Sequence, residues 1–134
     1  MSQEKSCGAV IVCGHEYIII KHRPERGGHW DFPKGQQKGT ETEKETAARE
    51  VYEETGIRIK FFDGFKETTT YYPKPGVLKT VTWFVGFCEK KKFNPITGEI
   101  IEHQWLPYDK ALKLLTFENG KQLLKKANEF LQFH

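Results

Sequence analysis

The chain has 134 residues, 37% of them hydrophobic and 29% charged, which is the size and composition of one ordinary globular domain with its own core. Its net charge of +3 is too mild to predict nucleic-acid binding. No apolar run approaches the roughly 18 residues that a membrane-spanning helix needs, so we expect one domain over residues 1–134 with neither nucleic acid nor a membrane as partner.

The chain opens with two β-rich runs, 7–12 and 17–21, which Gly14 and His15 join as a predicted hairpin. Residues 22–41 read as a loop, because prolines and glycines recur along it. Basic side chains crowd this region, namely Lys21, His22, Arg23, Arg26, His29 and Lys34. A cationic loop of this kind suits a polyphosphate substrate, and a solvated basic surface is the alternative.

An acidic helix is predicted over about residues 43–55. Thr42 and Glu45 have the spacing of a capping box, Thr40 and Glu43 are a second candidate, and Gly56 suits the left-handed residue that ends a helix. At roughly 3.6 residues per turn, one face carries the carboxylates of Glu43, Glu50, Glu53 and Glu54. The opposite face can pack on a core through Ala48, Val51, Tyr52 and Thr55.

Like charges three or four positions apart on one helix repel, as Glu50 does with Glu53 and Glu54. A bound divalent cation would turn this repulsion into binding, and all-oxygen ligands favour magnesium or manganese over zinc. A solvated acidic surface is the alternative for such a cluster.

Strands are predicted next over residues 57–62, 65–72, 77–88 and 100–106, with turns at 63–64 and 73–76. Apolar residues at helical spacing predict helices over 109–115 and 119–133, the second with Asn119 and Gln122 as a candidate capping box. Strands mixed with helices in one chain predict an α/β layered domain.

The three cysteines, Cys7, Cys13 and Cys88, lie in strand-like runs and are expected to be buried thiols. Their odd number and the lack of a CxxC pattern argue against a disulfide framework and a zinc site. The opening residues MSQEKS lack the apolar stretch of a signal peptide. We therefore expect a cytoplasmic protein.

Residues 35–57 fill every fixed position of the pattern G-x5-E-x7-R-E-U-x-E-E-x-G-U, in which U is aliphatic. A chance match to that many fixed residues is far rarer than roughly one in a million windows. The segment resembles a Nudix box, so the chain resembles a Nudix hydrolase. This resemblance implies an α/β/α sandwich around a mixed β-sheet.

The resemblance also implies hydrolysis of a phosphoanhydride with magnesium, for which manganese is a substitute. The implied metal ligands are the main-chain carbonyl of Gly35 and the carboxylates of Glu50, Glu53 and Glu54. Arg49 is then expected to orient the carboxylates, and a surface salt bridge is the alternative. Glu41 is expected to support the junction of loop and helix.

The general base varies across this family between a box glutamate and an acid on a distant loop. Glu99 is the distant candidate, as base or metal ligand, because Glu99 and Trp105 resemble the family's Glu-then-Trp stretch. Glu102 is the neighbouring competitor, and Glu50 remains the alternative base.

The flanks of the box resemble asymmetrical diadenosine tetraphosphate hydrolases, and the likeness spans nearly the whole chain. It rests on four segments, HWDFPKG at 29–35, GFK at 64–66, KTV at 79–81 and LLTF at 114–117. The implied reaction is cleavage of a small dinucleoside polyphosphate to ATP and AMP, with a monomer as the expected state.

This likeness implies phosphate contacts from His29, Lys34 and Lys79. It implies base stacking by Tyr71 and Phe117, for which a position in the core is the alternative.

One spacing leaves rival substrates open. Tyr71 and Tyr72 follow the box slightly earlier than the equivalent tyrosine of the tetraphosphate hydrolases, and Pro73 stands where ADP-ribose pyrophosphatases usually have proline. ADP-ribose, a nucleoside triphosphate and an RNA 5′ end are therefore alternative substrates. A silent nucleotide-binding module is a further alternative, against which the intact set of glutamates speaks.

Overall fold

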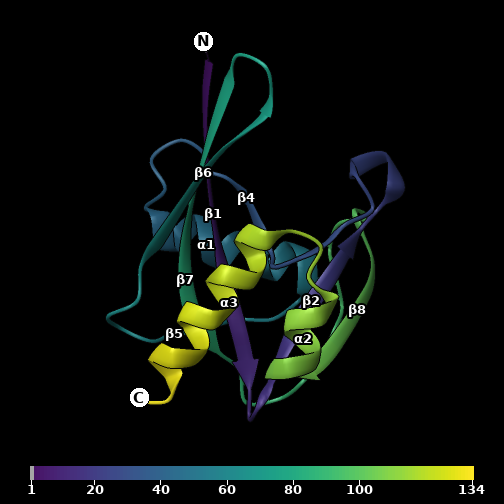
Figure 1. The fold of residues 1–134 in the computed structure, drawn as a ribbon, viewed down its shortest axis with the longest axis vertical. Coiled ribbons are helices and arrows are strands. Elements are labelled where there is room, and N and C mark those ends of the chain that lie inside the picture. The colour runs from purple at the N-terminus through teal and green to yellow at the C-terminus, as the bar shows by residue number, and fades with distance from the viewer. Residues whose placement is uncertain (1) are drawn as a thin grey trace.

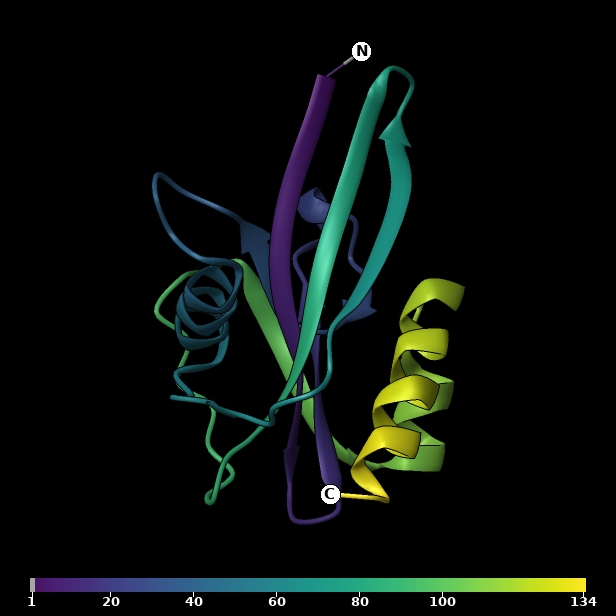
Figure 2. The same ribbon diagram turned by 90° about the vertical axis from the view of Figure 1, so that its left-hand side faces the viewer.

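A mixed β-sheet lies between helix α1 on one face and helices α2 and α3 on the other (Figures 1 and 2). The computed structural model describes residues 2–134. Its elements are β1 (Ser2–Cys13), β2 (Glu16–His22), the 3-10 turn η1 (Pro24–Arg26), β3 (Trp30–Asp31), β4 (Lys34–Gln36), α1 (Glu43–Thr55), β5 (Lys60–Phe61), β6 (Glu67–Lys74), β7 (Val77–Phe87), β8 (Ile100–Pro107), α2 (Tyr108–Leu114) and α3 (Glu118–Leu131).

Strand β1 is the centre of the sheet. It pairs in parallel with β7, from Ser2 opposite Val77 to Val12 opposite Phe87, and antiparallel with β2 and β4. Strand β2 continues the sheet to β3 and β8, and β7 continues it to β5 and β6. The predicted α/β layering is therefore confirmed, with a mixed sheet.

The apolar residues of β1 alternate between the two faces of the sheet, as the two-residue period of a strand requires. Ala9 and Ile11 pack with Val51 of α1 and the adjacent Ile57. The next residue along packs the other way, so Val10 joins the cluster that holds Leu123, Leu124 and Ala127 of α3. One strand thus holds both helical layers, which is why residues 7–13 are all buried.

Helix α1 begins and ends where its sequence predicts. Thr42 Oγ1 accepts a hydrogen bond from Glu45 N at 3.1 Å and Glu45 Oε1 accepts one from Thr42 N at 2.8 Å, so the first of the two candidate capping boxes forms. Gly56 ends the helix at φ 77°.

The buried face of α1, however, differs from the predicted one. Ala48 and Tyr52 are only half-buried, and the buried residues are Thr46, Ala47, Val51, Glu54 and Thr55. The helix is rolled about its own axis, so that part of its carboxylate face turns toward the sheet. The reason is that it packs on β1 through Ala47 and Val51. This roll brings one glutamate of the predicted acidic face into the interior.

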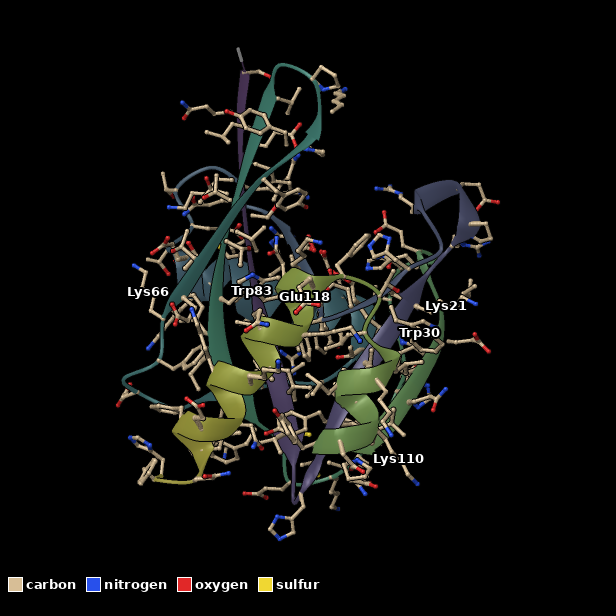
Figure 3. All side chains as sticks on the ribbon, in the orientation of Figure 1. Lys21, Trp30, Lys66, Trp83, Lys110 and Glu118 are labelled. Carbon is tan, nitrogen blue, oxygen red and sulfur yellow. The ribbon has the colours of Figure 1, made fainter. Side chains whose placement is uncertain are left out.

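The loop predicted over residues 22–41 contains short pairing segments. Strand β3 pairs with β2, and β4 pairs with β1, so Gly35 lies opposite Cys7. These contacts fasten the loop to the sheet, directly beside α1. Figure 3 shows Lys21 beside Trp30 at this edge of the sheet, where the Nζ of Lys21 lies 5.7 Å from the centre of the Trp30 ring.

Several later boundaries differ from their predictions. Strand β5 covers only two residues of the predicted run 57–62, and β6 continues through Pro73 to Lys74, so the turn falls on Pro75 and Gly76. Helix α3 begins after Phe117 without a side-chain cap, so the capping box of Asn119 and Gln122 is wrong. Gln122 donates instead to Glu118 Oε1 at 2.9 Å.

The three thiols are free, and Cys7 and Cys13 are buried as predicted, whereas Cys88 is half-buried at the end of β7. Among residues 2–134, no helix combines the length and the apolar character that crossing a membrane requires.

Candidate active site

Arg49 on α1 connects three glutamates and the loop before the helix. Its Nε lies 2.6 Å from Glu41 Oε2, and its Nη1 lies 3.1 Å from Glu53 Oε1 and 3.3 Å from Glu50 Oε1. Its Nη2 donates to the carbonyl of Gln36 at 2.9 Å. This arginine therefore fixes the helix to the loop while holding the carboxylates in a common region. The hydrogen bond from Arg49 is the main reason that the pKa of Glu41 falls to about 2.

Gly35 lies directly against the carboxylate of Glu50. A Cβ built on Gly35 would lie 1.8 Å from Glu50 Oε1, so any side chain at this position would displace the glutamate. The pairing of β4 with β1 brings the loop main chain this close to α1. The structure thus brings together two of the predicted metal ligands.

Glu54 is buried, with only 3% of its surface exposed, and its Oε1 has no hydrogen-bond partner among residues 2–134. Burial, followed by the charge of Glu50, raises the pKa of Glu54 well above its ordinary value. Burial also raises the pKa of Glu50. An unpaired carboxylate in the interior is costly, and a cation is the ligand that would offset the cost.

A cavity of about 510 Å³ opens beside the carboxylate of Glu50, and we call it the carboxylate cavity. Its lining comes from the loop, the sheet and α1, and consists of Ser6, His22, Arg26, His29, Lys34, Gly35, Gln36, Lys38, Glu50, Lys79 and Glu99. The predicted residues Gly35, Glu50 and Glu99 therefore meet in one place, although the last comes from a different segment of the chain.

A second cavity of about 730 Å³ adjoins the first, and we call it the aromatic cavity. Its lining is Arg26, Gly27, His29, Asp31, Lys34, Thr69, Tyr71, Pro73, Lys79, Phe117, Glu118 and Asn119. All five predicted substrate contacts lie in this lining. The two cavities share four nitrogen-bearing side chains, those of Arg26, His29, Lys34 and Lys79, so they form one continuous site.

The aromatic side chains in the second cavity differ in exposure. Phe117 is 52% exposed and its ring centre lies 5.1 Å from that of His29. Tyr71 is half-buried, packs against the core and lies opposite Lys79 in the pairing of β6 with β7. The alternative of a core position is thus partly correct for Tyr71. Phe117, by contrast, presents its ring to the cavity.

Asp31 was not among the predicted site residues, yet it holds one of them. Its Oδ2 lies 3.3 Å from Lys34 Nζ, and both side chains are nearly buried. Burial lowers the pKa of Lys34, but the charge of Asp31 and the neighbouring Tyr71 outweigh this effect and raise it. Lys34 therefore stays cationic inside the site. The spacing of opposite charges at 31 and 34 was the signal in the sequence.

His22, which the sequence placed among the basic side chains of the loop, is not a cation in the structure. It lines the carboxylate cavity, its ring centre lies 4.7 Å from that of His29, and its Nε2 is buried without a partner among the described residues. Burial, followed by the charges of His29 and Lys34, lowers the pKa of His22 to about 4. The imidazole is therefore neutral at physiological pH, and no feature of the sequence indicates this.

The two acids before Trp105 have different surroundings. Glu99 lines the carboxylate cavity and contributes to the raised pKa of Glu54. Glu102 lies on β8, where its Oε2 is 3.6 Å from Lys21 Nζ and its side chain is 58% exposed. The geometry therefore favours Glu99 over Glu102 as the distant acid of the site.

Among residues 2–134, no three His, Cys, Asp or Glu side chains converge closely enough to enclose a metal ion. The donor set nevertheless fits one, because Glu54 has an unpaired buried oxygen and Glu50 lies next to the Gly35 main chain. Hard oxygen ligands of this kind suit magnesium. Glu53 reaches the cluster through Arg49.

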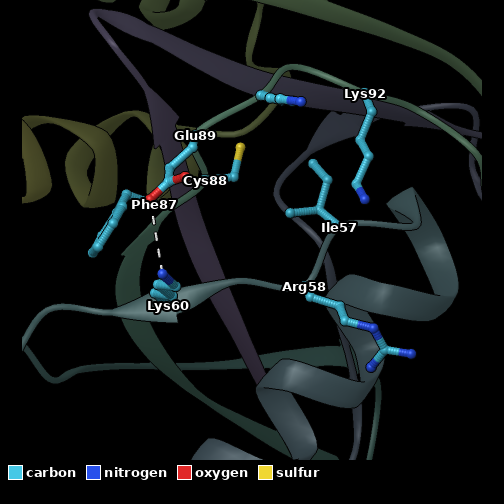
Figure 4. A pocket seen from close by; sticks show the side chains of 8 residues that line it. Ile57, Arg58, Lys60, Phe87, Cys88, Glu89 and Lys92 are labelled. Carbon is cyan, nitrogen blue, oxygen red and sulfur yellow. Dashed lines mark ion pairs between the residues drawn. The ribbon is translucent and has the colours of Figure 1, made fainter.

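Figure 4 shows a smaller hollow of about 220 Å³ at the end of β5 and β7, lined by Ile57, Arg58, Lys60, Phe87, Cys88, Glu89, Lys90 and Lys92. Lys60 Nζ lies 3.8 Å from Glu89 Oε1 there, and Arg58 lies 4.2 Å from the centre of the Tyr52 ring. Lys60 is thus paired with a carboxylate and Arg58 with an aromatic ring, so neither cation is free to bind phosphate as proposed for the two adjoining cavities.

Known proteins resemble this chain over most of its length. The family model of the NUDIX domain matches residues 4–127. An asymmetrical bis(5'-nucleosyl)-tetraphosphatase from Rattus norvegicus is 33% identical over 95% of both chains. An NAD-capped RNA hydrolase from Haemophilus influenzae is 31% identical over 79% of this chain, which spans 41% of that relative.

The fold comparison agrees with the sequence comparison. The crystal structure of a C. elegans Ap4A hydrolase binary complex has a TM-score of 0.86 and 25% identity, covering 98% of this chain and 99% of that chain. The predicted α/β/α sandwich around a mixed sheet is therefore confirmed. Because the family model spans nearly the whole fold and includes the acidic helix, this chain belongs to the Nudix hydrolase family.

Proposed function

We propose that this protein hydrolyses diadenosine tetraphosphate asymmetrically, to ATP and AMP, with bound magnesium. The observation that carries the proposal is the junction of the two cavities. Carboxylates lie at one end, aromatic rings at the other, and nitrogen-bearing side chains between them. A substrate with a long phosphate bridge between two nucleosides has matching parts. The rat and nematode relatives, similar over nearly their full lengths, support the same substrate.

In this proposal the metal ligands are Gly35, Glu50, Glu53, Glu54 and Glu99. When bound, magnesium neutralises charge on the phosphate oxygens and activates water. Arg49 orients the carboxylates by its contacts with Glu41 and Glu53. Manganese, which accepts the same oxygen ligands, is the expected substitute.

The phosphate chain lies, in this proposal, along the nitrogen-bearing side chains that the two cavities share. Lys34 and Lys79 neutralise it as cations, and His29 donates a hydrogen bond. Tyr71 and Phe117 stack on the base in the aromatic cavity. The carboxylates then lie beside the phosphate at the far end of the bridge, next to the second adenosine.

Glu99 is proposed as a metal ligand or as the general base, and Glu50 is the alternative base. A matched pair of variants tests this choice, because Glu99 and Glu102 lie close in sequence but only Glu99 faces the carboxylate cavity. We expect Glu99→Gln to lower kcat by roughly 100-fold, as loss of a general base does, and Glu102→Gln to leave it unchanged. Equal kcat values for the two variants would remove Glu99 from the mechanism.

The substrate is tested by giving the purified protein diadenosine tetraphosphate, ADP-ribose, ATP and triphosphate-ended RNA with magnesium. Separation of the nucleotides should give equal ATP and AMP from the first substrate, at the fastest rate of the four. In water labelled with oxygen-18, the label should enter AMP, because attack falls on the phosphorus next to one adenosine. Two ADP per molecule, or label in ATP, would contradict this position of attack.

ADP-ribose is a second candidate substrate, because Pro73 lines the aromatic cavity. This proline stands where ADP-ribose pyrophosphatases usually have one. Faster release of AMP and ribose phosphate from ADP-ribose than of ATP from diadenosine tetraphosphate would select this candidate. The proposal for either substrate describes a cytosolic monomer that acts on a small molecule.

A further inference from the structure

Glu99 lies in an irregular segment just before β8, and the loop after β2 fastens the main chain of that segment. The backbone nitrogen of Arg23 donates to the carbonyl of Glu99 at 3.0 Å, and the Nε of Arg23 donates to the carbonyl of Gly98. The main-chain position of Glu99 is thus fixed from one side. Its side chain is 43% exposed, so packing alone does not select its rotamer.

Arg26 supplies the orientation that packing does not. Its Nη2 lies 2.7 Å from Glu99 Oε1, and among residues 2–134 this is the one side-chain hydrogen bond or ion pair that Glu99 makes. Only one carboxylate oxygen is used. The other remains available to a ligand in the carboxylate cavity, whose lining includes both residues.

The loop is shaped to present Arg26 in this position. Residues 24–26 form the turn η1, in which Arg26 N donates to the carbonyl of Arg23 at 2.8 Å. Gly27 and Gly28 follow with φ values of 105° and 62°, which glycine adopts without strain. Their backbone nitrogens donate back to Pro24 and Arg23, so the turn is closed before the chain enters β3.

We infer that Arg26 is a positioning residue, which holds one oxygen of Glu99 so that the other faces a cation bound by Glu50 and Glu54. This inference rests on the proposed metal site. Partners that orient a metal ligand through its free atom raise metal affinity, and their loss costs about 10-fold to 100-fold. An exposed ion pair contributes little to folding. The effect of Arg26 should therefore appear in metal binding and not in thermal stability.

The test measures manganese binding by the electron paramagnetic resonance signal of the free ion, on the whole protein without substrate. Arg26→Met should weaken manganese affinity at least about tenfold, and Arg26→Lys should restore part of it, because lysine keeps one charged donor. Lys126→Met is the matched control, since Lys126 forms a similarly exposed pair with Glu67 at 3.3 Å on another part of the surface. Its affinity and its unfolding temperature should equal those of the wild type.

A double-mutant cycle then shows whether Arg26 acts through Glu99. In the Glu99→Gln background, Arg26→Met should cause no further loss of manganese affinity. Additive losses would overturn the inference, because Arg26 would then act independently of Glu99. An unchanged affinity in Arg26→Met, or an equal loss in Lys126→Met, would also overturn it.

The outcome is separable from the substrate proposal. A protein that ignores diadenosine tetraphosphate but loses manganese affinity in Arg26→Met refutes the substrate and keeps the positioning role. A wild type that binds no manganese overturns both the metal site and this inference. A lowered unfolding temperature in Arg26→Met, with unchanged affinity, would assign the residue a purely structural role.

Discussion

Arg49 donates two hydrogen bonds to Glu41, from Nε to Oε2 at 2.6 Å and from Nη2 to Oε1 at 3.1 Å. The same guanidinium reaches Glu53 and the carbonyl of Gln36. A lysine carries the same charge but cannot make this planar set of contacts. The geometry of the acidic cluster therefore depends on the shape of the arginine and not only on its charge.

We expect Arg49→Lys to lower turnover roughly tenfold or more, because the charge-assisted bonds it loses are worth about 1.5–3 kcal/mol each. Steady-state kinetics over a range of magnesium concentrations would measure the loss. Arg58→Lys is the control, since Arg58 lies over the ring of Tyr52 away from the cavities. Equal rates for wild type and Arg49→Lys would show that charge alone suffices.

Glu54→Gln should separate stability from activity. Removing a charge from a buried, unpaired carboxylate should raise the free energy of unfolding by about 1 kcal/mol in chelator. The same change should abolish most turnover, because a charged metal ligand is lost. Urea unfolding and magnesium titration would measure the two effects. Glu53→Gln, whose side chain is more exposed, should lose activity without gaining stability.

Lys34 and Lys79 line the same cavities, but replacing Lys34 should affect stability as well as substrate binding, whereas replacing Lys79 should affect substrate binding alone. Lys34→Met leaves Asp31 buried without its partner, so both stability and substrate capture should fall. Lys79→Met should raise KM or lower kcat about tenfold without a change in unfolding temperature. Lys74→Met is the control, because Lys74 is exposed at the end of β6. Unchanged kinetic constants in both cavity variants would remove these lysines from substrate binding.

Glu43 should make folding sensitive to acid. Lys5 and Lys66 each lie 2.8 Å from its carboxylate, and these hydrogen bonds lower the pKa of Glu43 to about 2. A carboxylate whose pKa is depressed by folding adds stability above its unfolded value of about 4.3. That stability is lost as the pH falls from there toward 2.

Urea unfolding between pH 2 and pH 7 should therefore show a smaller acid-induced loss of stability in Glu43→Gln than in the wild type. Glu41, whose pKa is also about 2, is present in both proteins and cancels from the comparison. Parallel stability curves for the two proteins would refute the role of Glu43.

Local signals predicted the elements that depend on a few neighbouring residues. The capping box of Thr42 with Glu45 and the end of α1 at Gly56 formed as expected, because both are set within one helical turn. The roll of α1, by contrast, is set by its packing on β1, which no periodicity in residues 43–55 encodes. For this reason the burial of Glu54 was not predictable from the sequence.

The site residues also divide into those that local sequence indicated and those that depend on tertiary structure. The motif and its flanks indicated Glu50, Lys79 and Phe117, which lie far apart in the chain but line the two adjoining cavities. The sequence favoured Glu99 but left Glu102 as a competitor, since both are acids in the same stretch before Trp105. Their different surroundings depend on which residue precedes β8 and which lies within it, a matter of strand register.

The parallel pairing of β1 with β7 governs when this protein can fold during its synthesis. Strand β1, with apolar residues on both faces, is synthesised before its long partner Val77–Phe87. Until that partner exists, the hairpin with β2 protects only one edge of β1, and the other is open to pairing with other chains. Slowly translated codons after β2 would lengthen this exposure, and the yield of soluble protein would then depend on chaperones that cover the nascent strand.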